Sequence, residues 1–337
     1  NICDNLERTA MPLQITIIGL GQIGTSIGLA LAKHSTQVRR IGHDKEHAVA
    51  REAHKKSAVD EIKHNLPSAV RGSDIILLCL PLNEIRGILE VIAADLKEGA
   101  VIMDTAPVKK AIGTWIKELI PEGRYYVGLV PVINPDYLHE TAVGIEAAHA
   151  DLFHNGLMLI TPLQGTPGGA VQLAADLSGL LGAAFLFSDP AEADGLMAST
   201  HLLPQLIATA LLNITVDQPG WLEARKLAGR AYAAATAPIV NQDEINALDE
   251  AALLNRENVV RVLDGMIASM QYLRDGIAAG DKGDLSARLA QAQEGRLRWW
   301  QERKTAAWLE TNKPDISAIP GFWERMLGSR IAPTSKK

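Results

Sequence analysis

A short glycine-containing segment near the start of the chain constrains the fold more than any other feature. Residues 13–18 are rich in β-branched side chains, as expected of a strand covered on both faces. Three glycines follow, Gly19, Gly21 and Gly24, and apolar residues then recur at helical spacing up to Leu31. A strand, a G-x-G-x-x-G turn and a helix in this order predict a dinucleotide-binding unit.

Each glycine of this turn has a separate expected task. Gly19 allows the tight turn, Gly21 lets the backbone approach a pyrophosphate, and Gly24 lets the helix pack against the sheet. The first N–H groups of the helix would face the anion. We therefore predict that the whole turn binds the cofactor, through Gly19, Leu20, Gly21, Gln22, Ile23 and Gly24.

An acidic residue stands where such a unit needs one. Asp44 follows a second predicted strand, 37–41, and lies about 20 residues beyond the last glycine. Its carboxylate can accept from both ribose hydroxyls and would repel a 2′-phosphate, which favours NAD over NADP. NADP remains possible because three basic residues lie nearby, Arg39, Arg40 and Lys45. Alternatively, or in addition, Asp44 caps a helix over 45–55.

Composition limits the class of protein. With 337 residues, 47% of them hydrophobic, the chain can form two domains and a large core. A net charge of −6 gives no electrostatic footprint for nucleic acid. Cys3 and Cys79 offer neither a disulfide framework nor metal-ligand spacing, so we expect no metal and a cytoplasmic location.

No membrane segment or signal peptide is predicted. The apolar stretch 202–216 is interrupted by Pro204, Gln205 and Asn213, and the first ten residues lack a basic region followed by an apolar one. We expect a small-molecule substrate and no membrane or nucleic-acid partner.

Residues 11–188 alternate predicted strands and helices, which indicates a Rossmann-type α/β domain with a mostly parallel sheet. Ligands of such sheets bind at the carboxyl ends of the strands. Four strand ends rich in Pro, Thr and Asp are therefore the predicted rim of the cleft: Leu80-Pro81, Asp104 to Pro107, Val130-Pro131 and Thr161-Pro162. Within this rim we expect Leu80, Pro81 and Thr105 to bind cofactor; Thr105 could instead cap a helix.

Residues 189–310 predict an all-helical domain. Long helices are expected over 191–216, 221–237, 242–279 and 285–308. Their apolar surface favours a homodimer over a closed monomeric bundle. Residues 311–337 form a proline-containing C-terminal extension that Ile319, Phe322 and Trp323 would dock on the body.

Six motifs, taken in order, resemble those of the prephenate and arogenate dehydrogenase family. They are Gly19 to Ser26, Cys79 to Pro81, Asp104 to Lys109, Gly128 to Pro131, Leu159 to Pro162 and Ser199 to Gln205, and the resemblance covers residues 12–305. It implies a nucleotide-binding domain followed by a helical dimerisation domain. It also implies NAD- or NADP-dependent oxidation of a cyclohexadienol with loss of CO₂, a step of tyrosine biosynthesis.

Three residues depart from the family pattern. The family's proton-accepting His is matched by Val130, the Ser that orients it by Pro107, and the Arg that clamps a substrate carboxylate by Ala237. An isopropyl group cannot accept a proton, and loss of a general base costs about 10²–10⁴ in rate. The departures indicate a changed substrate or lost activity.

Other residues could supply the missing chemistry. His201 matches a family His that faces the cleft, and it is our candidate acid or base; the alternative is a histidine satisfied inside a helix packing face. Arg230 could supply a cation from a new angle, or lie at a surface or interface. The candidate substrate-binding residues are Lys109, Asn134, Arg230 and Thr236.

Three functions remain open on the sequence alone. The first is an NAD(P)-dependent oxidoreductase that transfers hydride to or from a small, possibly cyclic carboxylate substrate other than prephenate. The second is a genuine prephenate or arogenate dehydrogenase in which His201 or water replaces the missing base. The third is a non-catalytic NAD(H)-binding sensor, which would have His201 buried away from the cleft.

Overall fold

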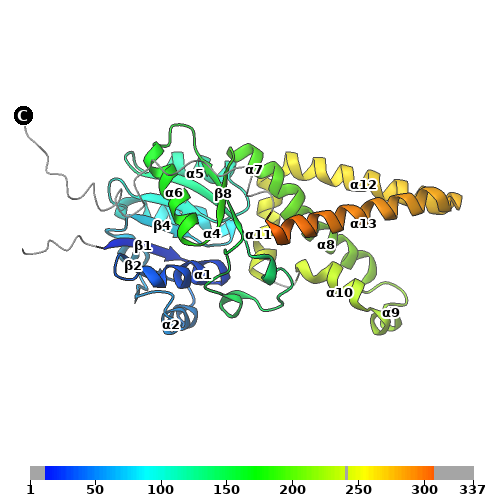
Figure 1. The fold of residues 1–337 in the computed structure, drawn as a ribbon, viewed down its shortest axis with the longest axis horizontal. Coiled ribbons are helices and arrows are strands. Elements are labelled where there is room, and N and C mark those ends of the chain that lie inside the picture. The colour runs from blue at the N-terminus through cyan, green and yellow to red at the C-terminus, as the bar shows by residue number, and fades with distance from the viewer. Residues whose placement is uncertain (1–11, 240–241, 307–337) are drawn as a thin grey trace, which may run out of the picture.

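The computed structural model describes residues 12–239 and 242–306, in two parts (Figure 1). The predicted extension 311–337, Cys3 and Trp308 lie outside these ranges. The first part is an α/β layer structure and the second consists of helices, which confirms the predicted fold class.

The first part is built on one eight-stranded sheet with the order β3-β2-β1-β4-β5-β6-β7-β8. Its strands are β1 (Leu13–Ile18), β2 (Val38–His43), β3 (Glu61–Ile62), β4 (Ile75–Leu78), β5 (Val101–Asp104), β6 (Tyr125–Val132), β7 (Leu157–Pro162) and β8 (Ala184–Phe187). The chain reverses its direction of winding between β1 and β4, and this is where open α/β sheets bind ligands.

Helices cover both faces of this sheet. They are α1 (Gln22–Leu31), α2 (His47–Lys55), α3 (Leu66–Val70), α4 (Leu82–Ile92), α5 (Lys110–Leu119) and α6 (Gly168–Leu180). Successive strand residues point to opposite faces, so Ile15 and Leu77 pack into one core with α1 and α6. Ile76 and Ile102 pack into a second core with α4 and α5. Burial on both faces explains why these strands are almost wholly apolar.

One strand departs from the predicted rim of the cleft. β7 runs antiparallel to β6, with Val127 opposite Pro162 and Val132 opposite Leu157. The carboxyl end of β7 therefore lies on the opposite side of the sheet from the carboxyl ends of β1, β2, β4, β5 and β6. The prediction that Thr161-Pro162 belongs to the rim is wrong, because the sequence pattern of a buried strand does not reveal its direction.

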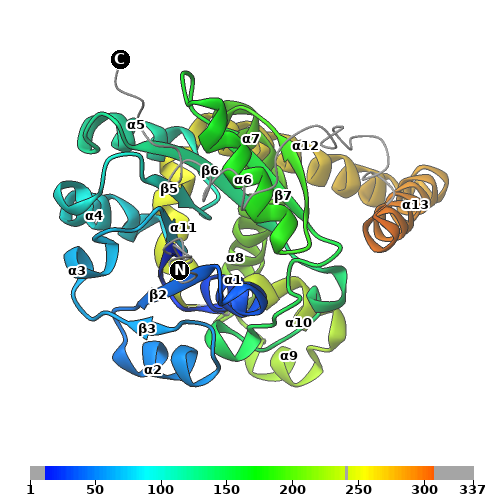
Figure 2. The same ribbon diagram turned by 60° about the vertical axis from the view of Figure 1, so that its left-hand side comes forward.

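The second part contains α7 (Pro190–Met197), a π-helical turn (Ala198–Leu202), α8 (Leu203–Thr215), α9 (Trp221–Leu227), α10 (Arg230–Thr236), α11 (Gln242–Leu254), α12 (Arg256–Ala279) and α13 (Lys282–Thr305). Figures 1 and 2 both show α12 and α13 extending together away from the sheet.

Two helices predicted as continuous are each divided. The helix expected over 221–237 breaks at Gly229, whose extended backbone (φ −105°, ψ −157°) precedes α10. The helix expected over 242–279 breaks at Asn255, whose amide Nδ2 donates to the carbonyl of Asp194 at 2.7 Å. Apolar periodicity continues across both breaks, so it could not reveal them.

The helical run Pro190–Thr215 is continuous, because Pro204 sits in the first turn of α8, directly after the π turn. By length and composition alone this run could cross a membrane, contrary to the interrupted stretch expected from the sequence. Four of its residues, Met197, His201, Leu202 and Gln205, line a cavity shared with the sheet.

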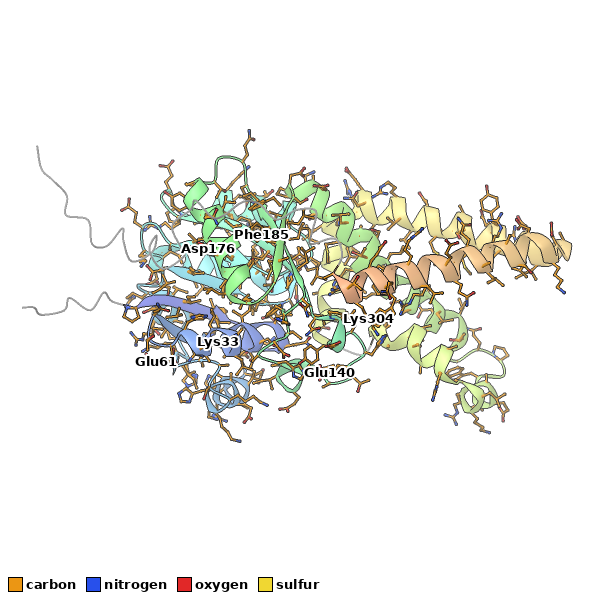
Figure 3. All side chains as sticks on the ribbon, in the orientation of Figure 1. Lys33, Glu61, Glu140, Asp176, Phe185 and Lys304 are labelled. Carbon is orange, nitrogen blue, oxygen red and sulfur yellow. The ribbon has the colours of Figure 1, made fainter. Side chains whose placement is uncertain are left out.

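The end of α13 returns to the α/β part. The Arg303 guanidinium donates to the carbonyl of Ile133, and the rings of Trp300 and His139 lie 5.2 Å apart. Figure 3 shows Glu140 and Lys304 at this junction. The helical part is thus anchored on the β6–β7 loop, residues 133–156.

Candidate functional site

A cavity of about 710 Å³ opens where the sheet meets the helical part. The sheet contributes the ends of β1, β2, β4, β5 and β6, and the β6–β7 loop contributes residues 140–145. Helices α1, α2 and α4 line the cavity on the side of the sheet, and α7, the π turn, α8, residues 237–238 and α11 line it on the helical side. One cavity therefore joins the predicted cofactor site to the helices.

The glycine turn has the geometry expected for a dinucleotide. Gly19 has φ +89°, and an added Cβ would lie 2.2 Å from the carbonyl oxygen of Cys79. A Cβ at Gly24 would lie 1.9 Å from the carbonyl oxygen of Gly19, so this glycine brings helix and strand together. A Cβ at Gly21 would meet no atom within 4 Å. The space beside Gly21 is where a pyrophosphate would approach.

The first turn of α1 has backbone N–H groups that could bind an anion. Gly21 is its N-cap residue and supplies no side-chain acceptor to the N–H groups that follow. Gly21, Gln22 and Ile23 line the cavity, whereas Leu20 is fully buried and Gly24 faces the sheet. Leu20 and Gly24 therefore lie outside the cavity lining and shape the turn from within.

Asp44 also lines the cavity. Its Oδ2 accepts from the N–H of Leu20 at 2.7 Å, and its Oδ1 accepts from the N–H of Glu46 at 2.8 Å. Helix α2 begins at His47 with Glu46 as its N-cap residue, so Asp44 is not the cap of this helix. The carboxylate is instead fixed against the glycine turn.

Two of the three basic residues near Asp44 face elsewhere. Arg40 is buried, with bonds to the Asp60 carboxylate and the carbonyls of Gly28 and Ser57. Arg39 pairs with Glu61 at the surface. In the described part of the chain, Lys45 is the single Lys or Arg among the lining residues, and it lies 2.6 Å from Glu84.

The ends of β4 and β5 complete the cofactor side. The cavity is lined here by three residues predicted to bind the cofactor, Leu80, Pro81 and Thr105. The N–H of Thr105 donates to the carbonyl of Leu78 at 3.1 Å. Cys79 lies among them, and burial raises the pKa of its thiol to about 12, so it is not a nucleophile here.

We call a second set of lining residues the substrate half, and it contains the three residues predicted from the sequence to depart from the family pattern, Pro107, Val130 and Ala237. Its residues are Pro107, Val130, Pro131, Met197, His201, Leu202, Gln205, Ala237, Pro238, Ala247, Leu248 and Ala251. Within this set, only His201 and Gln205 have polar side chains. Burial lowers the pKa of His201 below its ordinary value of 6.5, so the imidazole is neutral at neutral pH.

Lys109 does not reach the cavity, contrary to prediction. It is fully buried, and its Nζ lies 2.6 Å from Asp104 Oδ1. Asp104 Oδ2 accepts from the Tyr126 hydroxyl at 2.5 Å. Asp194, in α7, accepts from the N–H of Lys109 at 2.6 Å and joins this cluster to the helical part. The role of Lys109 is therefore structural: it pairs with a buried carboxylate at the end of β5.

Three other predicted substrate residues also lie outside the lining. Asn134 is buried and its Oδ1 accepts from the N–H of Asp136, which fixes the turn after β6. Arg230 is exposed at the start of α10. Thr236 donates its hydroxyl to the carbonyl of Tyr232 at 2.8 Å within the same helix. Neither the polar turn after β6, which holds Asn134, nor the helical segment 230–236 indicated in the sequence where these side chains point.

Gln205 and residues 140–145 of the β6–β7 loop were missed as site residues. Gln205 follows His201 by four positions, and residues so spaced share a helix face. That spacing was the available signal. The loop offered none, because its lining residues are small or ordinary surface types. No group of three or more His, Cys, Asp or Glu that could hold a metal is present in the described ranges.

Comparisons with known proteins agree with this arrangement. Residues 27–187 match the family model "Prephenate dehydrogenase, nucleotide-binding domain", and residues 189–291 match "Prephenate dehydrogenase, dimerization domain". The cyclohexadienyl dehydrogenase of Zymomonas mobilis is 27% identical over 84% of this chain and 94% of its own length. The prephenate dehydrogenase of Bacillus subtilis is 28% identical over 60% of this chain, and the match spans about half (53%) of that relative.

Solved structures show the same fold. Prephenate dehydrogenase from A. aeolicus, in complex with hydroxyphenyl propionate and NAD+, has a TM-score of 0.73 and 20% identity, covering 85% of this chain and 98% of that one. Synechocystis arogenate dehydrogenase has a TM-score of 0.67 and 23% identity, covering 85% and 100%. The two family models match both parts of the molecule in order, and the chain belongs to the prephenate dehydrogenase family.

Proposed function

We propose that this protein is an NAD-dependent oxidoreductase that transfers hydride between the nicotinamide and a small substrate other than prephenate. One observation carries the proposal. A single cavity joins an intact dinucleotide-binding turn to a wall that contains Val130, Pro107 and Ala237, the residues that we match to the family's base, its orienting Ser and its carboxylate clamp.

The residues present fit NAD. The uncapped N-terminus of α1 and the space beside Gly21 would receive the pyrophosphate, and the Asp44 carboxylate would bind the ribose hydroxyls. The site fits NADP less well, because Arg39 and Arg40 do not line the cavity and would not bind a 2′-phosphate there. Arg39 pairs with Glu61 and Arg40 with Asp60. The A. aeolicus relative has NAD+ bound. When bound, NAD supplies the hydride acceptor of the reaction.

His201 is the residue that we assign to proton transfer. Among the described residues that form the substrate half, it is the only titratable side chain. An alcohol that loses hydride must also lose its hydroxyl proton, and a neutral imidazole can accept one. Burial keeps His201 in this neutral form. Its place in the cavity wall argues against a sensor whose histidine is buried elsewhere.

The names of the relatives favour a second candidate, prephenate or arogenate dehydrogenation itself. His201 would then replace the missing base. The composition of the substrate half argues against this candidate, because none of its described lining residues is an Arg or Lys that could bind a carboxylate. We therefore rank this candidate second.

We also infer a homodimer. The model matched by residues 189–291 is named a dimerization domain. Large apolar side chains are exposed along α12 and α13, among them Ile267, Met270, Ile277, Leu289 and Leu297. A second copy would bury them.

The proposal is tested by titrating the purified protein with NADH and NADPH, followed by cofactor fluorescence. We expect NADH to bind in the micromolar range and NADPH to bind more weakly. Asp44→Ala should reduce this preference, and Asp176→Ala, on the outer helix α6, is the control. A screen of alcohols for NADH formation should then find turnover that His201→Gln removes. Absence of NADH binding would contradict the proposal, and binding without turnover of any alcohol would favour the sensor.

A further inference from the structure

Gln205 carries a buried acceptor that no group in the described part of the chain satisfies. The residue is 5% exposed, lines the cavity, and lies in the first turn of α8. Its Nε2 donates to the carbonyl of His201 at 3.1 Å. Within the described residues, no group donates to its Oε1. The backbone carbonyl of His201 can only accept a hydrogen bond, so the side-chain group that faces it must be the Nε2 donor of Gln205. This fixes the orientation of the Gln205 amide, with Oε1 on the other side.

Such an acceptor is costly to keep. A buried polar atom without a hydrogen-bond partner makes the folded protein less stable than one that is hydrogen-bonded. Native proteins therefore contain few such atoms. The helix is unusual at the same place. The N–H of Leu203 bonds to the carbonyl of Ala198, a π-helical spacing, and Pro204 follows with no N–H to donate. Turns of this type recur at functional sites.

The surroundings of Oε1 define what it can bind. The substrate half offers an apolar lining, one neutral imidazole and this one amide oxygen. The charged lining residues Asp44, Lys45, Glu46, Glu84 and Glu140 come from the other elements, around β2, α4 and the β6–β7 loop. An anionic substrate would lose its hydration here without gaining a cation. The half-cavity therefore favours an uncharged ligand.

His201 and Gln205 are separated by four residues, which places them on one helix face about one turn apart. The imidazole is assigned to the reacting hydroxyl, and Oε1 accepts only from a donor. A ligand that uses both must carry two groups, and the second must be an O–H or N–H. We propose that Gln205 is a specificity-determining residue whose Oε1 accepts a hydrogen bond from a second hydroxyl of an uncharged diol. This inference rests on the proposed oxidoreductase function.

The test compares four probes on the NADH-saturated protein, in which an alcohol is not oxidised. They are 1,4-cyclohexanediol, 4-methoxycyclohexanol, cyclohexanol and 4-hydroxycyclohexanecarboxylate, and binding is measured by saturation-transfer NMR titration. The ether lacks only the second donor, and the carboxylate adds a charge. We expect the diol to bind about 3- to 10-fold more tightly than the ether or cyclohexanol, the range of one neutral hydrogen bond, and more tightly than the carboxylate.

Gln205→Met should remove the preference for the diol over the ether and leave NADH affinity unchanged. Gln172→Met, the same change in helix α6 outside the cavity, should keep the preference. The comparison of diol and ether on the unaltered protein needs no variant, so it stands even if Gln205→Met is unstable. Equal binding of diol and ether, a preference that survives Gln205→Met, or binding of none of the four probes would overturn the inference. Loss of NADH binding would instead count against the proposed function.

Discussion

At the residue scale, the ionisation of His201 decides whether it can accept a proton. Burial lowers its pKa below 6.5. As the pH falls below this value, the unfolded chain binds the proton first, so stability decreases between pH 6.5 and the pKa of the folded state. We expect an NMR titration of the His201 ring proton to have its midpoint below 6.5. The spectrum of the His201→Gln variant identifies the signal, because it lacks that ring proton. The stability of the variant should not show the decrease that protonation of His201 causes below pH 6.5. A midpoint at or above 6.5 would contradict the assigned environment.

The buried pair of Lys109 and Asp104 makes a second prediction at this scale. Removing one partner leaves an uncompensated charge in a site of zero exposure, so Lys109→Met should cost about 3–5 kcal/mol of stability, seen in denaturant unfolding. Lys226→Met removes an exposed lysine, 3.4 Å from Glu223, and should change stability by less than about 1 kcal/mol. A loss at Lys109 as small as that at Lys226 would show that the pair is not buried in solution.

The sequence indicated which residues could belong to the site, but it did not indicate in which direction their side chains point. His201 and Thr105 line the cavity, whereas Lys109 and Asn134 point into the protein. All four lie close to predicted strand ends or cleft helices, so position along the chain did not distinguish them. Their directions depend on partners far away in sequence, such as Asp194 for Lys109, and these partners meet only in the folded protein.

At the scale of elements, two glycines of the turn between β1 and α1 have different roles: we expect one to affect the stability of the fold and the other to affect cofactor binding. A Cβ at Gly24 would collide with the Gly19 carbonyl, whereas a Cβ at Gly21 would enter open space. Gly24→Ala should therefore lower stability by about 1–3 kcal/mol. Gly21→Val should leave the melting temperature nearly unchanged and weaken NADH binding at least about tenfold, since its side chain would occupy the pyrophosphate site.

Gly87→Ala is the matched control for these variants, because its Cβ also meets nothing within 4 Å but lies on α4, outside the cavity lining. It should leave NADH binding unchanged and raise stability by about 0.5–1 kcal/mol, because alanine is favoured over glycine inside a helix. If Gly21→Val bound NADH as tightly as the unaltered protein, the cofactor would not approach this turn.

Elements with strong local patterns were predictable, and those set by distant contacts were not. The strand and helix around the glycine turn, 13–31, form as the pattern predicts. The direction of β7, the break at Asn255 and the π turn before Pro204 follow from packing between elements. Periodicity contains no information on these three features.

At the scale of the whole molecule, the exposed face of α12 and α13 predicts the oligomeric state. Sedimentation velocity should give twice the chain mass of 36.3 kDa. Replacing Ile267 and Met270, 54% and 57% exposed, by Glu should produce a monomer, because the charges would be buried at the interface. Val91→Glu, a 49% exposed position on α4, is the control and should stay dimeric. A monomer without any substitution would contradict the inferred homodimer.

The central claim concerns both halves of the cavity together: the cofactor half is kept and the substrate half is changed. It is tested most directly by the rate of NADH formation from prephenate, and from arogenate, at saturating NAD+. With no base at Val130 and no cation at Ala237, we predict a rate below that of a family member with His and Arg by at least about 10²-fold, the typical cost of losing a general base. NADH should still bind. Robust turnover of either compound would contradict the account.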